Sequence, residues 1–281
     1  MTLLVFAIVL LAATLHAFWN FAAKKVSGNL GALWLGLCLA SVLSWPWALF
    51  LQRTEGLTLA GVLYILATGT IHAWYFGFLA RSYAVGDISL VYPVARGTGV
   101  AGTAVVAVIW LHEGLSVLGL SGILAICLGT GLVGFSRHAF KDEAGAYLHA
   151  LLVGATITGY SIIDKLAVGH VHPVVYISGM STVAALLLAP YVLRRHCAAC
   201  RQAYRHLKPA ICLIGLGSMG TYLLILFAYR LGPVSYIVAV REFAVVIGAL
   251  LGFLVLKERL TARRVLGITA ITLGLVLVKL A

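Results

Sequence analysis

Long apolar runs separated by short polar turns fill almost the whole chain. Most runs approach the roughly 20 residues that an α-helix needs to cross a bilayer. The runs lack the period-two alternation of apolar and polar residues that barrel strands show. The first run continues past Ala17 to Ala23 with no basic residue before it, which favours a helix over a cleaved signal peptide. The pattern predicts ten membrane-spanning helices, at about residues 3–23, 30–51, 59–80, 88–110, 117–135, 146–164, 174–193, 210–229, 234–256 and 262–280.

The composition supports the same class of protein. Hydrophobic residues make up 62% of the 281 residues and charged residues only 10%, whereas about 25% charged residues is typical of a soluble domain. We therefore predict an all-α integral membrane protein whose helices leave no room for a soluble domain.

The basic residues predict how the chain is oriented. If successive helices alternate in direction, 14 Lys and Arg residues fall on one side of the membrane and four on the other, namely Arg53, Lys165, Arg230 and Lys279. The positive-inside rule places the 14 in the cytoplasm of a bacterium and both termini outside its inner membrane. The net charge of +12 thus reflects topology and contact with anionic lipids rather than nucleic-acid binding.

An internal repeat divides the chain into two predicted units, residues 1–140 and 141–281. Gly86-Asp87-Ile88-Ser89 through Arg96 recurs as Gly232-Pro233-Val234-Ser235 through Arg241, and His112-Glu113-Gly114-Leu115-Ser116 recurs as Lys257-Glu258-Arg259-Leu260-Thr261. Gly122 and Gly129 correspond to Gly267 and Gly274, Tyr83 to Tyr229, and, more weakly, Trp19, Asn20 and Lys24 to Tyr160, Ser161 and Lys165. Five crossings per unit would invert the second unit, as in secondary transporters with a substrate cavity between the repeats.

The order of these features resembles the ten-helix, EamA-type branch of the drug/metabolite transporter superfamily. The resemblance rests on the duplicated halves, the glycine-spaced closing helices ending at Val133 and Val278, the Ala-x-x-x-Gly-x-x-Ser turn from Ala228 to Ser235, and the loops Glu113-Gly114 and Lys257-Glu258-Arg259-Leu260-Thr261. It implies alternating access around a central cavity, with small polar metabolites such as amino acids or sugar conjugates as cargo. It does not specify the substrate.

Two arginines, Arg96 and Arg241, lie inside apolar runs at equivalent places in the two halves, whereas the other 18 Lys and Arg residues lie at or near segment ends. An Arg at the centre of a membrane helix costs roughly 2.5–3.5 kcal/mol on insertion scales, so it needs an anionic partner or a polar cavity. The pair therefore predicts a site that handles negative charge.

Glu242 follows Arg241 directly, and adjacent residues point about 100° apart on a helix, so the two cannot form a good intrahelical pair. One hypothesis is that Glu242 pairs with Arg96 across the repeat interface. One arginine would then remain uncompensated, which suits an anionic or zwitterionic solute because a guanidinium binds phosphate or carboxylate in a bidentate way.

Polar residues at helical spacing predict the walls of the cavity. His16, Asn20 and Lys24 share one face of the first run, and Thr156, Tyr160 and Asp164 repeat this stripe in the second half. We predict that the substrate-binding residues are Arg96, Arg241, Glu242, His16, Asn20, Trp19, His72, Tyr75, Tyr92, Tyr160 and Tyr222. The alternatives are that the tyrosines pack, that His16 links helices, and that Lys24 and Asp164 extend to the interface from their helix ends.

A second set of residues is predicted to couple or gate transport: His16, His72, Glu242, Lys24, Asp164 and Lys165. Histidine titrates near neutral pH, which suits proton coupling. The small multidrug relatives of this superfamily exchange protons for cationic drugs through a Glu in their first helix. The first run here offers His16 and no carboxylate, which argues against a cationic-drug exporter.

The predicted function is secondary transport of a small anionic or zwitterionic metabolite, such as a phosphonate, a phosphorylated or carboxylated compound, or an amino acid. The stretch His16-Ala17-Phe18-Trp19-Asn20, followed by Lys24, resembles a subset of EamA-like proteins associated with phosphonate utilisation. A flippase for a lipid-linked anionic sugar or lipid is the alternative. A membrane enzyme acting on a phosphorylated lipid is a remote one, because the chain lacks a paired-Asp metal motif, a Gly-rich phosphate loop and a nucleophile motif.

No metal or cofactor is predicted. His196, Cys197, Cys200 and His206 lie in the longest predicted loop with metal-like spacing, but a second firm ligand pair is missing. The expected partners are a small-molecule or lipid-linked substrate and membrane lipids, with no nucleic acid, and the chain is expected to be a monomer or a homodimer.

Overall fold

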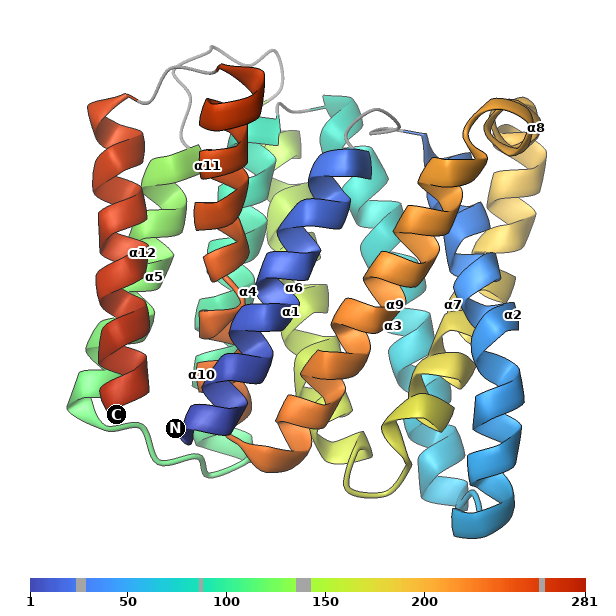
Figure 1. Cartoon of the computed structure of the whole chain (residues 1–281), viewed down its shortest axis with the longest axis horizontal. Helices are drawn as coiled ribbons and strands as arrows, with labels where there is room; N and C mark the ends of the chain where they lie inside the picture. The colour runs from blue at the N-terminus through green and yellow to red at the C-terminus, as the bar shows by residue number, and fades with distance from the viewer. Residues whose placement is uncertain (24–28, 86–87, 135–142, 258–260) are drawn as a thin grey trace.

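The computed structural model describes residues 1–23, 29–85, 88–134, 143–257 and 261–281, and all of its regular elements in these ranges are α-helices. Most predicted runs appear as helices with nearly the predicted bounds (Figure 1). The helices are α1 (Leu3–Ala23), α2 (Leu30–Glu55), α3 (Leu59–Val85), α4 (Ile88–Trp110), α5 (Val117–Gly134), α6 (Glu143–Ala167), α7 (Pro173–Arg195), α8 (Cys197–His206), α9 (Lys208–Leu231), α10 (Val234–Val240), α11 (Phe243–Leu256) and α12 (Ala262–Leu280).

Nine stretches of the described chain are long and apolar enough to cross a membrane, and one of them, Val234–Val255, covers α10 and α11 together. The nine do not include α12, which has 19 residues but carries Arg263, Arg264 and Lys279 near its ends. The structure therefore confirms an all-α, multi-pass membrane protein. The number of ten crossings remains a prediction.

The segment from Cys197 to His206, predicted as a loop, is the short helix α8. Its Cys200 and Ala203 are buried, while Arg201 and Arg205 are exposed, so its surface is divided into an apolar and a basic side. At ten residues it is too short to span a bilayer, and this division suits a helix lying at the membrane surface. Figure 1 shows α8 at the end of the bundle opposite both termini.

The helix predicted over residues 234–256 is interrupted at Arg241 and Glu242, between α10 and α11. Across the interruption the Glu242 amide donates to Ala239 O at 3.0 Å and the Ala244 amide to Arg241 O at 3.1 Å, so bonds reach back three residues instead of four. The run from 234 to 247 contains no Gly or Pro, and the sequence therefore gave no sign of this break. Discontinuous membrane helices of this kind often form transporter sites.

The short helix α10 lies at the centre of the bundle. All seven of its residues are buried, and it packs against α1, α4, α5, α6, α9 and α12. The helix break that follows it is consequently held among helices from both halves of the chain.

Close packing between the closing helices of the two halves, α5 and α12, depends on glycine. A Cβ atom at Gly122 would lie 2.8 Å from Gly274 O, and one at Gly129 would lie 2.6 Å from Gly267 O. Glycine allows this approach of two backbones, which is how helices associate closely in lipid. Figure 1 shows the two helices side by side at one edge of the bundle.

Candidate functional site

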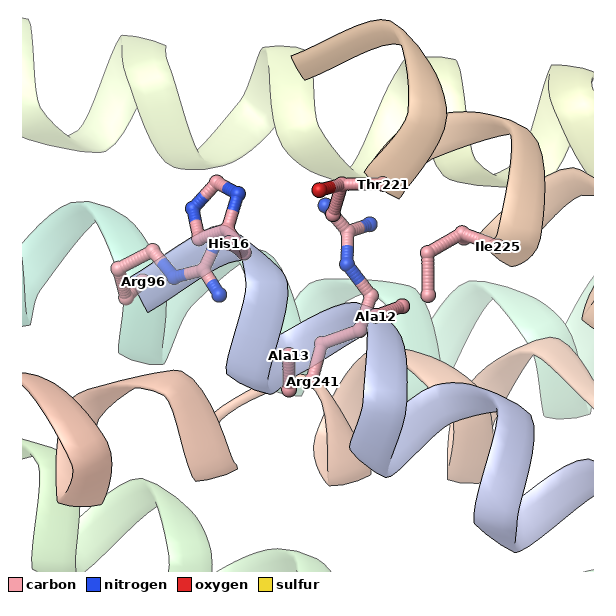
Figure 2. A pocket seen from close by; sticks show the side chains of 7 residues that line it. All are labelled: Ala12, Ala13, His16, Arg96, Thr221, Ile225 and Arg241. Atoms are coloured by element: carbon pink, nitrogen blue, oxygen red, sulfur yellow. The ribbon is translucent and has the colours of Figure 1, made fainter. Parts of the chain in front are cut away.

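A small cavity lies between the two halves of the chain and brings both predicted arginines together (Figure 2). It encloses about 200 Å³ of empty space, including its opening. Ala12 and Ala13 leave room for it on α1, one turn from His16. Its seven lining residues are Ala12, Ala13 and His16 from α1, Arg96 from α4, Thr221 and Ile225 from α9, and Arg241 from the helix break.

Arg96 forms an ion pair with Glu242, with 2.6 Å between Nη2 and Oε1. The Glu242 side chain is 1% exposed and the Arg96 side chain 13% exposed, so the pair is largely removed from solvent. It joins α4 to the break between α10 and α11. The pair that the sequence analysis raised as a hypothesis is thus present.

Arg241 has a different environment. Its guanidinium Cζ lies 5.6 Å from the centre of the Tyr222 ring, a cation–π distance. No ion pair to Arg241 is found among the residues that the structure describes. Figure 2 shows its side chain reaching toward Thr221 across the cavity. Among the described residues, Arg241 is therefore the cavity arginine without a carboxylate in ion-pair contact.

Several buried polar atoms at this site lack a hydrogen-bond partner within the described part of the chain: Arg96 Nε, Glu242 Oε2, Thr221 Oγ1 and Trp19 Nε1. An unsatisfied buried polar atom costs about 1–3 kcal/mol. Such atoms are rare in folded proteins and call for water or a ligand. These four atoms gather at and beside the cavity.

The predicted polar face of α1 is only partly directed at the cavity. His16 lines it and contacts the edge of Trp19, with 5.1 Å between ring centres. Asn20 is exposed and its Nδ2 donates to His16 O at 2.8 Å, one turn back on the same helix. Lys24 lies outside the described residues.

The predicted aromatic residues form a cluster between α3, α6 and α9. His72 stacks on Tyr160 with ring centres 4.5 Å apart, and Tyr75 and Tyr222 contact the same Tyr160 ring edge-on at 6.1 and 6.2 Å. Tyr92 is half-buried one turn before Arg96 on α4. This cluster adjoins the cavity through Tyr222, whose ring faces Arg241.

Asp164 is fully buried, with an exposed fraction of 0%, so the idea that it extends to the interface from its helix end is wrong. Its carboxylate accepts hydrogen bonds from Thr68 Oγ1 at 2.7 Å, from Tyr176 OH at 2.6 Å and from Tyr222 OH. The sequence analysis missed Thr68 and Tyr176. The position of Thr68 one turn before His72 was the available signal for the first of them.

Lys165 and Glu113 hold the connection between α9 and α10, and we call them the α9–α10 clamp. Lys165 Nζ donates to Tyr229 O at 2.6 Å and to Gly232 O at 2.8 Å, which satisfies carbonyls at the end of α9. The Glu113 carboxylate accepts from Val234 N at 2.7 Å, Ser235 N at 3.1 Å and Ser235 Oγ at 2.6 Å, which caps α10. The described contacts of Lys165 are thus with a helix end rather than with the cavity.

Within the ranges that the structure describes, no group of three or more His, Cys, Asp or Glu side chains is arranged to hold a metal ion. The described residues that line the cavity offer two guanidinium groups, one imidazole and one hydroxyl.

Comparison with known proteins agrees with a transport fold. Residues 144–280 match the EamA-like transporter family, and residues 32–126 match the Small Multidrug Resistance protein family. A search of the curated proteins gives no match. A protein of known crystal structure, 16% identical to this chain, superposes with a TM-score of 0.73 over 99% of this chain and 96% of its own, which shows a shared fold. Each family match covers less than half of the chain, and together with the apolar helices the two matches make the chain similar to membrane transporters of the drug/metabolite transporter type.

Proposed function

We propose that the protein is a secondary transporter that moves a small anionic or zwitterionic metabolite across the membrane by alternating access. The observation that carries this proposal is the charge of the cavity. Two guanidinium groups, Arg96 and Arg241, line it, and the described structure pairs only Arg96 with a carboxylate. The cavity therefore carries one excess positive charge, which matches one acidic group on a solute.

The chemistry around Arg241 favours a phosphonate, a phosphorylated compound, or the carboxylate of an amino acid or other metabolite. A guanidinium presents a planar fork of donors to such groups. The unpartnered Thr221 hydroxyl and Arg96 Nε supply further donors. The cavity is small and seven residues line it, which favours a small solute over a lipid-linked sugar. The resemblance of the stretch from His16 to Asn20 to proteins of phosphonate utilisation agrees with this class.

Two inverted five-helix repeats, residues 1–140 and 141–281, give the proposed transport cycle its architecture, with α12 as the tenth crossing. The helix contacts support this arrangement: α1 packs on α9 and α11 as α6 packs on α3 and α4, and α5 packs on α12. The backbone supports it too. His112 and Lys257, at equivalent sequence positions, both adopt a positive φ, 53° and 54°, which is uncommon for residues other than glycine.

The match to the Small Multidrug Resistance family does not favour a cationic drug as the substrate. The matched residues, 32–126, contain three acidic residues, Glu55, Asp87 and Glu113. Glu55 is the last residue of α2 and Glu113 follows the end of α4, whereas Asp87 lies outside the described residues. The first helix, α1, has no carboxylate either. Within the described residues, these helices therefore place no carboxylate in their interior as the counter-charge of a cation.

Orientation and energy coupling complete the proposal. Both termini lie at one end of the bundle, opposite the basic helix α8 (Figure 1), which fits termini outside the inner membrane under the positive-inside rule.

We propose that a proton gradient drives the cycle, with His16, His72 and Glu242 as the groups able to couple proton movement. In this proposal the chain acts as a monomer or a homodimer.

A thermal-shift screen of the purified protein tests the substrate class. The ligand sets are phosphonates, phosphorylated amines, carboxylates, amino acids, lipid-linked sugars and cationic dyes. We expect the small anions and zwitterions to raise the unfolding temperature, because they neutralise the cavity charge. Stabilisation by cationic dyes alone would overturn the proposal, and stabilisation by lipid-linked sugars alone would support a flippase instead.

A further inference from the structure

A second buried polar site lies behind the cavity wall, around Asp164 on α6. The carboxylate is fully shielded from solvent, and the described structure shows no ion pair to it. An ionisable residue at this depth in a membrane protein is costly and usually functional. Its three hydrogen-bond donors come from α3, α7 and α9, so the group is placed where several helices meet.

The titratable and charged groups around Asp164 come from each helix that packs near it. His72 lies on α3, Tyr176 on α7, Tyr222 and Tyr229 on α9, and Arg241 follows α10. The helix α4 carries Tyr92 and Arg96, and α6 itself carries Tyr160 and Lys165. Lys165 directs its ammonium away, to Tyr229 O and Gly232 O. Asp164 therefore meets hydroxyls and, one residue further out, an imidazole.

A hydrogen-bonded path leads from His72 to Asp164. His72 Nδ1 lies 2.9 Å from Thr68 O and 3.2 Å from Thr68 Oγ1. A carbonyl can only accept, so Nδ1 carries a hydrogen and donates it, which leaves Nε2 free to take a second proton. The Thr68 hydroxyl in turn donates to Asp164 Oδ1. The chain His72–Thr68–Asp164 can thus pass a proton toward the carboxylate.

Tyr222 connects this buried site to the cavity. Its hydroxyl donates to Asp164 Oδ2, and the face of its ring lies 5.6 Å from Arg241 Cζ. A single side chain consequently senses both the charge of Asp164 and the occupancy of Arg241. Such a shared element is what a coupling free energy between two sites requires.

We propose that Asp164 is the proton-binding site of the transporter and that Tyr222 couples it to the anion site at Arg241. The proton enters through His72 and Thr68 and converts the carboxylate to a carboxylic acid. The proton binds Oδ1, the oxygen that Thr68 contacts, so Oδ2 becomes the carbonyl oxygen of a neutral acid. The Tyr222 hydroxyl then donates to a neutral oxygen instead of a carboxylate, its hydrogen bond weakens, and the ring can move from its present position against Arg241. This inference rests on the proposed anion transport, and it adds the group that carries the proton and the residue that transmits its effect.

Infrared difference spectroscopy of the purified full chain tests proton binding without a substrate. A pH step should produce the C=O band of a buried protonated carboxyl in the wild type. Asp164→Asn should abolish this band, while Glu113→Gln should retain it, because Glu113 belongs to the α9–α10 clamp. An unchanged band in Asp164→Asn, or no such band in the wild type at any pH at which the protein stays folded, would overturn the assignment.

Proteoliposomes test the coupling, with radiolabelled 2-aminoethylphosphonate as the probe. Asp164→Asn should still exchange the probe when the pH is equal on both sides of the membrane. The accumulation of the probe that an imposed pH gradient drives should fall at least tenfold in this variant. Tyr222→Phe keeps the ring but removes the hydroxyl bonded to Asp164, and it should also reduce the gradient-driven accumulation at least tenfold. Gradient-driven accumulation by Asp164→Asn at the wild-type level would contradict the inference. Failure of the wild type to bind any anion would instead contradict the proposed function, and the infrared band would still report on Asp164.

Discussion

Glu242 and Arg96 form an ion pair of 2.6 Å that joins the helix break in the second half of the chain to α4 in the first. The pair breaks the symmetry between the halves. Glu242 follows Arg241 directly, but the residue that follows Arg96 is Gly97. Position 97 therefore offers Arg241 no carboxylate, and in our proposal this difference leaves the cavity with an excess positive charge.

The missing carboxylate can be restored at Gly97. A Cβ atom there meets no heavy atom within 4 Å, so the helix has space for a side chain. We expect Gly97→Glu to pair with Arg241 as Glu242 pairs with Arg96, and to weaken binding of a small anion at least about tenfold, since close charge pairs are worth more than about 1.4 kcal/mol. Isothermal titration calorimetry measures the effect, and Gly97→Gln is the control of equal size without the charge. Equal affinities of the two variants would contradict the symmetry argument.

Removal of one charge from the buried pair should destabilise the protein. Glu242→Gln leaves Arg96 without its carboxylate, and breaking a buried ion pair costs about 3–5 kcal/mol. The double variant Arg96→Met, Glu242→Leu removes both charges, and we expect it to recover much of the stability. Thermal unfolding in detergent compares the three proteins. Equal unfolding temperatures for Glu242→Gln and the wild type would show that the pair is not energetically important.

The contact between α5 and α12 provides a test of packing away from the cavity. Gly129→Ala would place a Cβ atom 2.6 Å from Gly267 O, whereas a Cβ atom at Gly131 on the same helix meets nothing within 4 Å. We expect Gly129→Ala to lose about 1–3 kcal/mol by overpacking, and Gly131→Ala to lose none. Chemical denaturation of the two variants gives the difference. A similar loss in both would mean that helix propensity or backbone flexibility, rather than close contact, sets the requirement for glycine.

The α9–α10 clamp is expected to protect the backbone amides of the connection between α9 and α10 from hydrogen exchange. Lys165→Met removes the donor to Tyr229 O and Gly232 O, and unsatisfied carbonyls there should cost about 1–3 kcal/mol. Hydrogen exchange should become faster in the connection from 229 to 235 before it changes elsewhere. Arg230→Gln, which removes an exposed charge beside the same connection, serves as the control. Unchanged exchange in Lys165→Met would show that the clamp does not limit opening of this segment.

Sequence reasoning predicted the helices well because length and apolar content decide which segments enter a membrane. It also placed Arg96, Arg241 and His16 together, since buried charges and the repeat restrict where they can lie. It missed α8, because ten residues are too few to be recognised as a membrane-spanning helix. It also missed the break at Arg241, because no Gly or Pro lies there. The hydrogen-bond partners of Asp164 could not be predicted from the sequence either. Tyr176, for example, lies on another helix, and tertiary packing decides which face of that helix is turned toward Asp164.

The affinity of Arg241→Gln for a small anion tests the central claim most directly. Calorimetry measures the dissociation constant of the anion that most stabilises the wild type. The control variant is Arg230→Gln, which removes an arginine charge away from the cavity. The account predicts wild-type affinity for Arg230→Gln and at least about tenfold weaker binding for Arg241→Gln, in line with the roughly 1.5–3 kcal/mol of a hydrogen bond to a charged group. Wild-type affinity in a folded Arg241→Gln protein would contradict it.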